Sequence, residues 1–352
     1  MLCALILLSE KMRKNTKRGF CTFTKAGSWH ILDVKKDLFG GNMEIRKIGI
    51  AGAGLMGASM SQIFAKYGYD VVVYDAFESA LEKGRRLIEV NQRTQTEAGE
   101  QSAEEEARVL AALKYSSDIN SLADRDIIIE SIIENLEIKQ KFWAQLSRIV
   151  REDCILTTNT SGLPIDSIAA DIVGKHRFLG MHWVNPAHLI PFIEIIRGSE
   201  TDDASTSAVT ELAHKVGKKT GVCKKDVPGF IFNRIQLAVI RECISLVEQG
   251  IADPEDVDAT VKYGLGFRYA AIGPFEVVDL GGIDTFHHIA SYLNRELCAT
   301  PEVQPLMDEL YKAGNYGVKT GKGFYDYSEG KDVEALKNRD EKFLKIYNAL
   351  YK

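Results

Sequence analysis

One short turn, Gly52-Ala53-Gly54-Leu55-Met56-Gly57, restricts the fold of this chain more than any other feature. It lies between an apolar run that ends at Ile50 and a helical pattern that continues to Lys66, and a second apolar run, Val71 to Tyr74, follows. Glycines in this spacing also mark ordinary turns, but a G-x-G-x-x-G turn between the strand and helix of a βαβ unit is typical of a dinucleotide-binding domain.

The residue types in this turn suit a bound pyrophosphate. The first glycine allows a tight turn, the second lets the backbone approach the phosphates, and the third lets the helix pack closely against the strand. The helix that follows directs its free N–H groups toward the anion. The predicted contacts with the cofactor in this loop are Gly52, Gly54, Leu55, Met56 and Gly57.

Asp75 stands at the end of the second predicted strand, eighteen residues after Gly57. A carboxylate there accepts hydrogen bonds from a ribose diol, and its charge repels a 2′-phosphate. NAD is therefore the predicted cofactor, rather than NADP. FAD is the other ligand that such a loop could hold, but the sequence carries no further flavin signal.

Strands and helices alternate as far as Pro228, which predicts an α/β domain with a Rossmann-like, doubly wound, mainly parallel sheet over residues 45–228. Helical periodicity prevails afterwards, with "GLGF" and "GGIDTF" as turns, so an all-helical C-terminal domain is expected over residues 229–328. A last helix is predicted over residues 329–352, with one apolar face formed by Leu336, Phe343, Ile346, Tyr347 and Leu350.

The first 44 residues differ in composition from the rest and are interpreted as an N-terminal extension. Its apolar start, "MLCALILL", is too short to span a membrane and precedes the basic cluster, whereas a secretory signal carries its charge first. We therefore expect a cytoplasmic protein. One alternative is a mitochondrial transit peptide. The other is an upstream extension outside the native chain, because "FGGNM" back-translates into a purine-rich ribosome-binding stretch followed by a start codon at Met43.

Charge and cysteine content exclude several classes of function. The formal net charge is −5, and the chain after residue 42 carries 36 basic against 46 acidic residues, which argues against a nucleic-acid partner. The six cysteines show no C-x-x-C spacing, as expected of reduced thiols rather than of a disulfide framework or a zinc site. No metal, membrane or nucleic-acid partner is predicted.

The segment "GMHWVNPAHLIPFIEII", residues 180–196, places His182 and Glu194 in otherwise apolar runs. An enzyme that oxidises an alcohol with a nicotinamide needs a base for the hydroxyl proton, and imidazole has a pKa near neutrality. If the segment folds back near His188, then His182 and Glu194 lie side by side, and the carboxylate fixes the imidazole tautomer. The alternative is a core histidine and a strand-edge glutamate without a catalytic role.

Two further polar residues are candidates for holding the substrate oxygen. Ser161 follows the predicted strand "CILTTNTS", and Asn233 lies one turn into the helix after Pro228-Gly229. Taken alone, each is more often a helix cap or a turn residue. His188 lacks further ligands at metal-binding spacing and is interpreted as a loop residue of the cleft.

Seven motifs in unbroken order from Ile45 to Tyr327 resemble the 3-hydroxyacyl-CoA dehydrogenases, including the bacterial 3-hydroxybutyryl-CoA dehydrogenases. They are "GAGLMG", "ESIIENLEIKQ", "TTNTSGLPI", "GMHWVNPAHLIPFIEII", "DVPGFIFNRI", "GPFEVVDLGGID" and "KTGKGFYDY". The resemblance implies a Rossmann-like domain, a helical domain that forms a homodimer, and an active site in the cleft between them.

Carried over position by position, the resemblance also implies roles for individual residues. His182 would be the general base and Glu194 its partner, while Ser161 and Asn233 would contact the substrate oxygen. Further contacts along the NAD site would be made by Glu134, Lys139, Asn185 and Lys319.

The chain departs from the acyl-CoA pattern where the substrate binds. Trp183-Val184 replaces a pair of phenylalanines, and Gly162 replaces a serine or threonine. In the helical segment after Asp75, residues 91–108 read "NQRTQTEAGEQSAEEEAR" instead of a lysine-rich sequence, which would suit CoA phosphates. An Arg268-Tyr269 insertion resembles the branch of λ-crystallin, L-gulonate dehydrogenase and carnitine dehydrogenase.

These features leave three functions open. The first is NAD-dependent oxidation of a short-chain L-3-hydroxyacyl-CoA such as 3-hydroxybutyryl-CoA, with His182 as base. The second is the same chemistry on a small non-CoA 3-hydroxy acid of the L-gulonate or carnitine type, with Arg268 gripping the carboxylate. The third is an inactive, crystallin-like structural protein, against which the four retained polar site residues argue.

Overall fold

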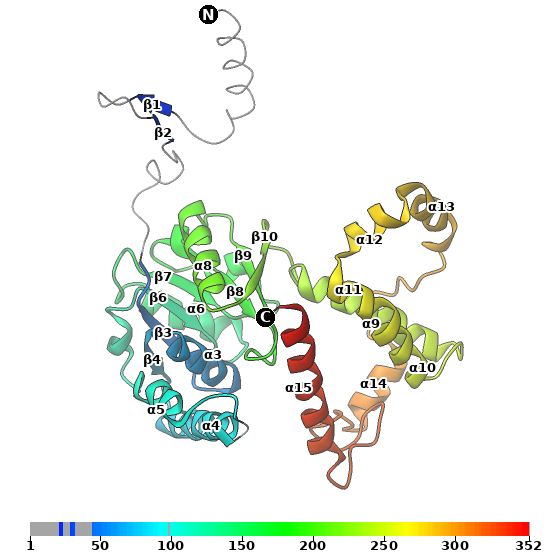
Figure 1. The fold of residues 1–352 in the computed structure, drawn as a ribbon, viewed down its shortest axis with the longest axis horizontal. Helices are drawn as coiled ribbons and strands as arrows, with labels where there is room; N and C mark the ends of the chain where they lie inside the picture. Colours follow the sequence, from blue (N-terminus) through cyan, green and yellow to red (C-terminus); the bar gives the residue numbers. More distant parts are fainter. Residues whose placement is uncertain (1–20, 24–28, 32–43, 98, 352) are drawn as a thin grey trace, which may run out of the picture.

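The computed structural model describes residues 21–23, 29–31, 44–97 and 99–351, and it shows a sheet domain beside a helical domain (Figure 1). Most of the predicted N-terminal extension, and with it the predicted start at Met43, lies outside the described residues. Within it, β1 (Cys21–Phe23) and β2 (Trp29–Ile31) form an antiparallel pair.

The sheet domain is built on eight strands in the order β10-β9-β8-β7-β6-β3-β4-β5. Neighbouring strands are parallel except for β8 and β9. Because β4 and β6 flank β3, the strand order reverses there, as in a doubly wound sheet, which confirms the predicted fold class. The strands are β3 (Lys47–Ala51), β4 (Asp70–Tyr74), β5 (Leu113–Ser116), β6 (Ile127–Glu130), β7 (Ile155–Thr158), β8 (Phe178–Trp183), β9 (Phe192–Arg197) and β10 (Lys219–Cys223).

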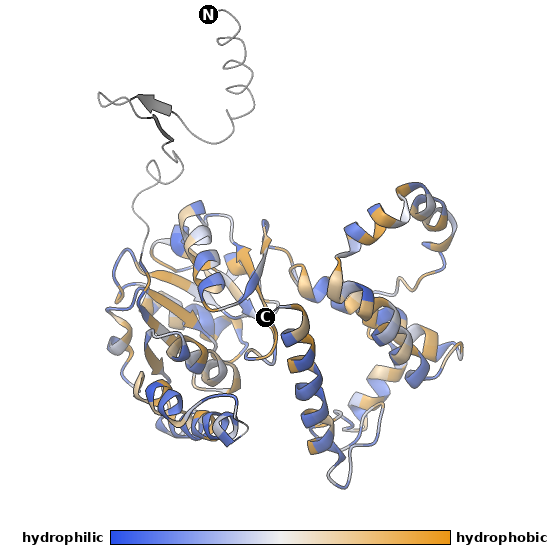
Figure 2. Cartoon of the chain, viewed as in Figure 1, coloured by the Kyte–Doolittle hydropathy of each residue, from blue (hydrophilic) through white to orange (hydrophobic). Residues whose placement is uncertain are grey.

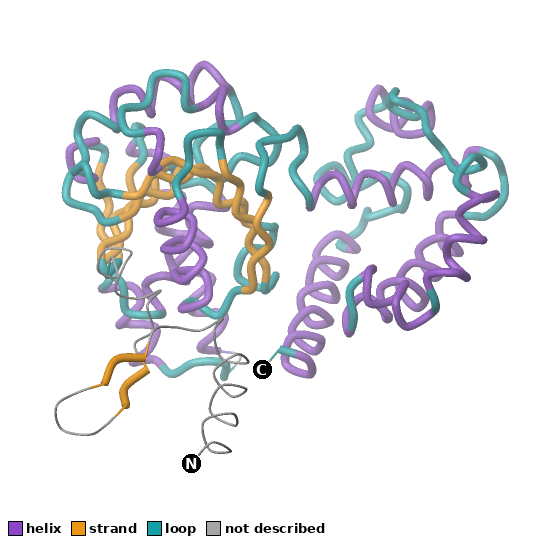
Figure 3. Tube along the Cα trace, turned by 90° about the horizontal axis from the view of Figure 1, so that it is seen from above, coloured by secondary structure: helices purple, strands orange, loops and turns teal. Residues whose placement is uncertain are grey.

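Helices cover both faces of this sheet (Figure 3). Strands such as β6, with the sequence IIIE, are apolar on both faces because both are buried. Side chains of α3, α4, α5 and α8 pack into one core and those of α6 and α7 into the other. The helices are α3 (Leu55–Lys66), α4 (Glu78–Glu97), α5 (Ala103–Ala111), η1 (Ile119–Leu122), α6 (Leu136–Leu146), α7 (Ile165–Ile168), η2 (Lys175–Arg177) and α8 (Asp203–Lys215).

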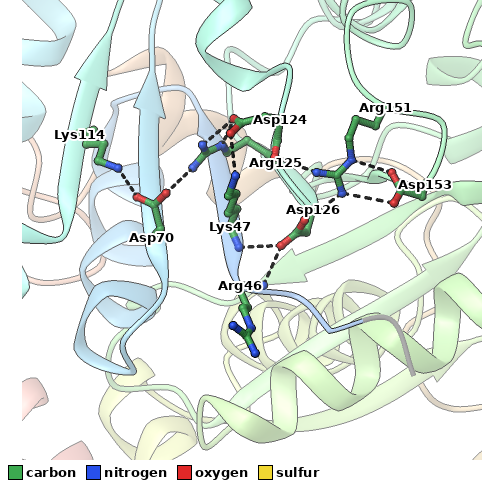
Figure 4. Close-up of polar contacts among 9 residues, drawn as sticks. All are labelled: Arg46, Lys47, Asp70, Lys114, Asp124, Arg125, Asp126, Arg151 and Asp153. Carbon is green, nitrogen blue, oxygen red and sulfur yellow. Dashed lines mark hydrogen bonds and ion pairs between the residues drawn. The ribbon is translucent and has the colours of Figure 1, made fainter. Parts of the chain in front are cut away.

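Ion pairs and hydrogen bonds join the amino-terminal ends of the parallel strands (Figure 4). Asp126, just before β6, accepts the backbone N–H groups of Arg46 and Lys47, both at 2.8 Å. Asp70 at the start of β4 pairs with Nη1 of Arg125 at 3.0 Å. Each partly exposed pair stabilises the fold by at most about 1 kcal/mol. The network ties the strands together at the edge opposite to the phosphate turn.

The helical domain buries few of its apolar side chains. Among the hydrophobic residues described after residue 230, the buried ones are only Ile244, Val257 and Val277. Hydrophobic stretches are visible along the helices of this domain (Figure 2). No described helix is both long and apolar enough to cross a bilayer. The helices are α9 (Phe232–Glu248), α10 (Pro254–Ala259), the π-helix η3 (Thr260–Gly266), α11 (Phe267–Ala271), α12 (Pro274–Gly281), α13 (Ile283–Leu293), α14 (Pro305–Lys312) and α15 (Lys331–Leu350).

One predicted turn in this domain is wrong. The sequence "GLGF" predicts a break, but Gly264 and Gly266 continue a helical path as part of η3. Gly266 has φ of −63°, which a helix accepts from any residue. The glycines therefore permit a wider helical turn instead of ending the helix, whereas Gly282, with φ of +92°, does separate α12 from α13.

Candidate active site

The glycines of the phosphate turn occupy positions with different steric demands. Gly52 has φ of +106°, which favours glycine, and a Cβ at Gly57 would lie 1.8 Å from the carbonyl oxygen of Gly52. A Cβ at Gly54 would meet nothing within 4 Å. Two glycines therefore build the turn, while the open space at Gly54 matches the approach of a ligand.

The start of α3 fits an anion. No side chain caps it, its first turn carries no acidic residue, and Leu55 is 58% exposed. Asp75 lies beside it, because its Oδ2 accepts the N–H of Ala53 at 2.9 Å. Sequence reasoning missed Gly84 of α4, where a Cβ would stand 2.5 Å from the Ala53 carbonyl oxygen and push the helix away from the turn.

His182 and Glu194 face each other across the antiparallel pair β8–β9, as the symmetry about the loop predicts. His182 is 4% exposed and Glu194 fully buried, and Nδ1 of His182 lies 3.2 Å from Oε2 of Glu194. A carboxylate only accepts hydrogen bonds, so it places the proton on Nδ1 and leaves Nε2 free to act as a base. The other oxygen, Oε1, accepts the backbone N–H groups of Ile231 and Phe232 at 2.6 and 3.1 Å.

Ser161 and Asn233 come together from the two domains. Nδ2 of Asn233 donates to the carbonyl oxygen of Ser161 at 2.6 Å. Glu134 accepts the N–H of Ser161 at 3.0 Å and the hydroxyl of Thr160 at 2.5 Å. Burial opposes the charge of Glu134, but these hydrogen bonds and the charge of Lys139 outweigh it and lower the pKa of Glu134. The turn is thus held by an ionised carboxylate.

Lys139 lies beneath this turn rather than at its surface. Its side chain is 1% exposed, and its Nζ pairs with Glu130 at 2.5 Å and Glu134 at 3.3 Å. Trp143 and Thr158 donate to the other oxygen of Glu130. A direct contact between Lys139 and a cofactor stays a prediction. Sequence reasoning missed Glu130, although a glutamate that ends an apolar strand was a usable signal.

The loop after β8 carries Asn185, whose side chain is exposed and whose peptide bond to Pro186 is cis. Lys218 holds this loop from below, because its Nζ donates to the carbonyl oxygens of Ala187 and Ile190 at 2.7 and 2.8 Å. Burial lowers the pKa of Lys218 to about 8. Nothing in the local sequence distinguishes Lys218 from its neighbour Lys219, so sequence reasoning missed it.

Other predicted residues lie elsewhere. Lys319 is exposed in the segment between α14 and α15, which Figure 1 places in the helical domain away from the phosphate turn, so its contact with NAD stays a prediction. Arg268 is exposed on α11. His188 is exposed in the loop after β8. In the described part of the chain, no group of three or more His, Cys, Asp or Glu side chains is arranged to hold a metal ion.

Two family models cover most of the chain. Residues 47–227 match 3-hydroxyacyl-CoA dehydrogenase, NAD binding domain, and residues 229–327 match 3-hydroxyacyl-CoA dehydrogenase, C-terminal domain. The chain belongs to the 3-hydroxyacyl-CoA dehydrogenase family. This confirms the resemblance of the motifs, the NAD cofactor and the assignment as an NAD-dependent oxidoreductase.

Relatives of this dehydrogenase have two kinds of substrate in their names. A probable 3-hydroxybutyryl-CoA dehydrogenase of Deinococcus radiodurans is 37% identical over 282 residues, which cover 80% of this chain and 100% of the relative. A 5-formyl-3-hydroxy-2-methylpyridine 4-carboxylate 5-dehydrogenase of Mesorhizobium japonicum is 34% identical over 307 residues, which cover 87% of this chain and 98% of the relative. A crystal structure of a 5-dehydrogenase of this kind, described as an NAD+-dependent dismutase, has a TM-score of 0.80 at 34% identity and covers 87% of this chain and 99% of its own.

Proposed function

We propose that this dehydrogenase oxidises the C3 hydroxyl of short-chain L-3-hydroxyacyl-CoA thioesters such as 3-hydroxybutyryl-CoA. The observation that carries the proposal is the buried pair of His182 and Glu194 at the carboxyl edge of a dinucleotide-binding sheet. The start of α9 contacts this pair through Glu194, and the next residue of α9, Asn233, is bonded to Ser161. This edge of a doubly wound sheet is where ligands bind. The match to 3-hydroxybutyryl-CoA dehydrogenases supports the substrate.

In this reaction His182 takes the hydroxyl proton at Nε2, and Glu194 stabilises the imidazolium that forms. The Ser161 hydroxyl has no hydrogen-bond partner among the described residues, so it can donate to the oxygen as it becomes a carbonyl, and Asn233 orients the turn that carries it. Gly52, Gly54 and the start of α3 would hold NAD, which accepts the hydride that leaves C3.

Two observations favour a second candidate, the oxidation of a small carboxylic acid that carries no CoA. The match to the pyridine-carboxylate dehydrogenase extends over more of this chain than the match to the Deinococcus enzyme. The first turn of α5 also carries three glutamates, Glu104 to Glu106, near which CoA phosphates would be repelled. Arg268 is the proposed carboxylate contact in this case.

The absorbance of NADH separates these candidates. Acetoacetyl-CoA and acetoacetate are each supplied with NADH, and L-gulonate with NAD, at the same enzyme concentration. Turnover of acetoacetyl-CoA with at least tenfold higher kcat/KM than of the free acids is the expected result. Turnover of the free acids alone would contradict the first candidate function and support the second. No turnover of any of the three substrates would contradict both candidate functions.

We also propose that the helical domain forms a homodimer. Its exposed apolar side chains include Phe267 at 79%, Phe275 at 86% and Leu280 at 77%. An apolar groove of about 440 Å³ lies between α9, α10 and η3. Large apolar patches are rare on the surfaces of monomeric proteins, and a second copy of the chain offers the same apolar side chains in return.

A further inference from the structure

Two consecutive residues in the left-handed region connect the domains. Gly229 has φ of +75° and Phe230 has φ of +50°, directly before α9. Phenylalanine rarely adopts a positive φ, and such a conformation persists only where the surroundings fix it. Phe230 is fully buried, so the packing of its ring holds the backbone in this conformation.

This Gly229-Phe230 turn determines where the backbone of α9 begins. The next two N–H groups, those of Ile231 and Phe232, both point at Oε1 of Glu194. The first N–H groups of a helix have no partner within the helix, and they carry its positive dipole end. No lysine or arginine pairs with Glu194 among the described residues, so the start of α9 supplies the polar stabilisation of this buried carboxylate.

Phe230 of this turn and Phe232, the first residue of α9, both contact the imidazole of His182. The ring of Phe230 lies 6.1 Å from that of His182 at an interplanar angle of 61°, and the ring of Phe232 lies 6.2 Å away at 73°. Edge-to-face contacts of this kind fix ring orientation. His182 is thus contacted by Glu194 and by two aromatic rings from the segment that enters the helical domain.

We propose that the Gly229-Phe230 turn is a positioning element for the catalytic pair, which seats the start of α9 on Glu194 and so holds His182 in its proton-accepting orientation. The role of His182 in this statement rests on the proposed function. A displacement of α9 would remove two hydrogen bonds from the carboxylate that orients the base. The orientation of the His182 imidazole as a proton acceptor therefore depends on the position of the helical domain.

A matched pair of glycines tests this role. Gly229 and Gly250 both have positive φ, +75° and +66°, and neither would have a Cβ closer than 3.4 Å to another atom. Gly250 lies at the end of α9, remote in the chain from His182. Replacing either by alanine imposes the same left-handed penalty without a clash. We expect Gly229→Ala to lower kcat about tenfold or more and Gly250→Ala to leave kcat within about twofold, with the KM for NAD unchanged in both.

A graded variant and a spectroscopic signal complete the test. Asparagine tolerates left-handed backbone better than alanine, so Gly229→Asn should recover part of the lost kcat even if Gly229→Ala folds poorly. In the ¹⁵N-histidine NMR spectrum, the Nδ1–H signal that disappears in His182→Gln should shift in Gly229→Ala and stay in place in Gly250→Ala.

The outcomes separate the two proposals. If His182→Gln keeps its kcat, the proposed function is wrong. If His182→Gln is inactive while the Gly229 and Gly250 variants have equal kcat and unshifted Nδ1–H signals, the proposed function stands and the positioning role is overturned.

Discussion

At the scale of single residues, Glu194 has the most demanding environment in the site. It is fully buried, and both of its oxygens are occupied, one by His182 and the other by the start of α9. Because both carboxylate oxygens of Glu194 already have hydrogen-bond partners, the isosteric amide of glutamine can replace the carboxylate with little change in packing. That separates the effect of its charge from the effect of its shape.

We predict that Glu194→Gln lowers kcat by about 10³- to 10⁴-fold and leaves the melting temperature nearly unchanged. The amide oxygen can still accept the N–H groups of Ile231 and Phe232. The amide nitrogen would donate to Nδ1 of His182, which moves the imidazole proton to Nε2 and blocks the base. Steady-state kinetics and thermal unfolding check this, and a kcat within tenfold of the wild type would contradict it.

The lowered pKa of Lys218 predicts that the stability of the fold rises with pH. Its pKa is about 8 in the folded chain and about 10.4 when unfolded, because burial penalises the charge. The buried charge lowers the free energy of unfolding, and this loss is fully present below pH 8. It disappears as the pH rises to about 10, because the unfolded chain binds more protons than the folded chain between these pH values.

We therefore expect the free energy of unfolding of the wild type to rise by about 3 kcal/mol relative to that of Lys218→Met between pH 7 and pH 10. Urea unfolding of both proteins at each pH measures this difference. A difference that does not change with pH would show that the Lys218 ammonium is not penalised by burial.

At the scale of elements, the phosphate turn allows binding to be separated from folding. Gly57→Ala would place a Cβ 1.8 Å from a backbone oxygen, whereas Gly54→Ala meets no atom of the chain. We predict that Gly57→Ala destabilises the fold by about 1 to 3 kcal/mol or more. Gly54→Ala should keep its stability but bind NAD at least tenfold more weakly, because the added methyl group occupies the place of the phosphates.

Chemical unfolding and calorimetric titration with NAD measure both quantities. If Gly54→Ala binds NAD as the wild type does, the pyrophosphate does not approach the backbone at this glycine.

The sequence predicted local features of these elements well. The β3–α3–β4 unit follows from periodicity and glycine spacing, and the pairing of His182 with Glu194 follows from their equal distance from one loop. It did not predict that β10 runs parallel to β9, and so against the other strands of the sheet, because hydrophobic periodicity carries no direction. The contacts of Lys218 with its loop and of α9 with Glu194 join residues about 30 or more positions apart, and no local pattern marks them.

At the scale of the whole molecule, the contrast between the two domains is the main feature. The sheet domain has two continuous apolar cores, while the helical domain exposes large apolar side chains (Figure 2). A domain that buries so little on its own gains stability from association.

We predict that the chain sediments as a dimer at micromolar concentration and that Phe275→Glu shifts it toward monomer. Phe275, on α12, is 86% exposed, and a charge there would be buried without a partner in a dimer. Val173→Glu is the control, because Val173 is 50% exposed on the sheet domain. Sedimentation velocity measures both variants, and a dimer that survives Phe275→Glu would place the interface elsewhere.

The proposed NAD-dependent oxidation requires that His182 accepts the substrate proton. The most direct test compares kcat and the NADH dissociation constant of His182→Gln with those of the wild type, using the substrate that the wild type turns over. We predict that kcat falls at least 10²-fold while the dissociation constant stays unchanged within about twofold, because the imidazole lies outside the phosphate turn. An undiminished kcat would contradict it.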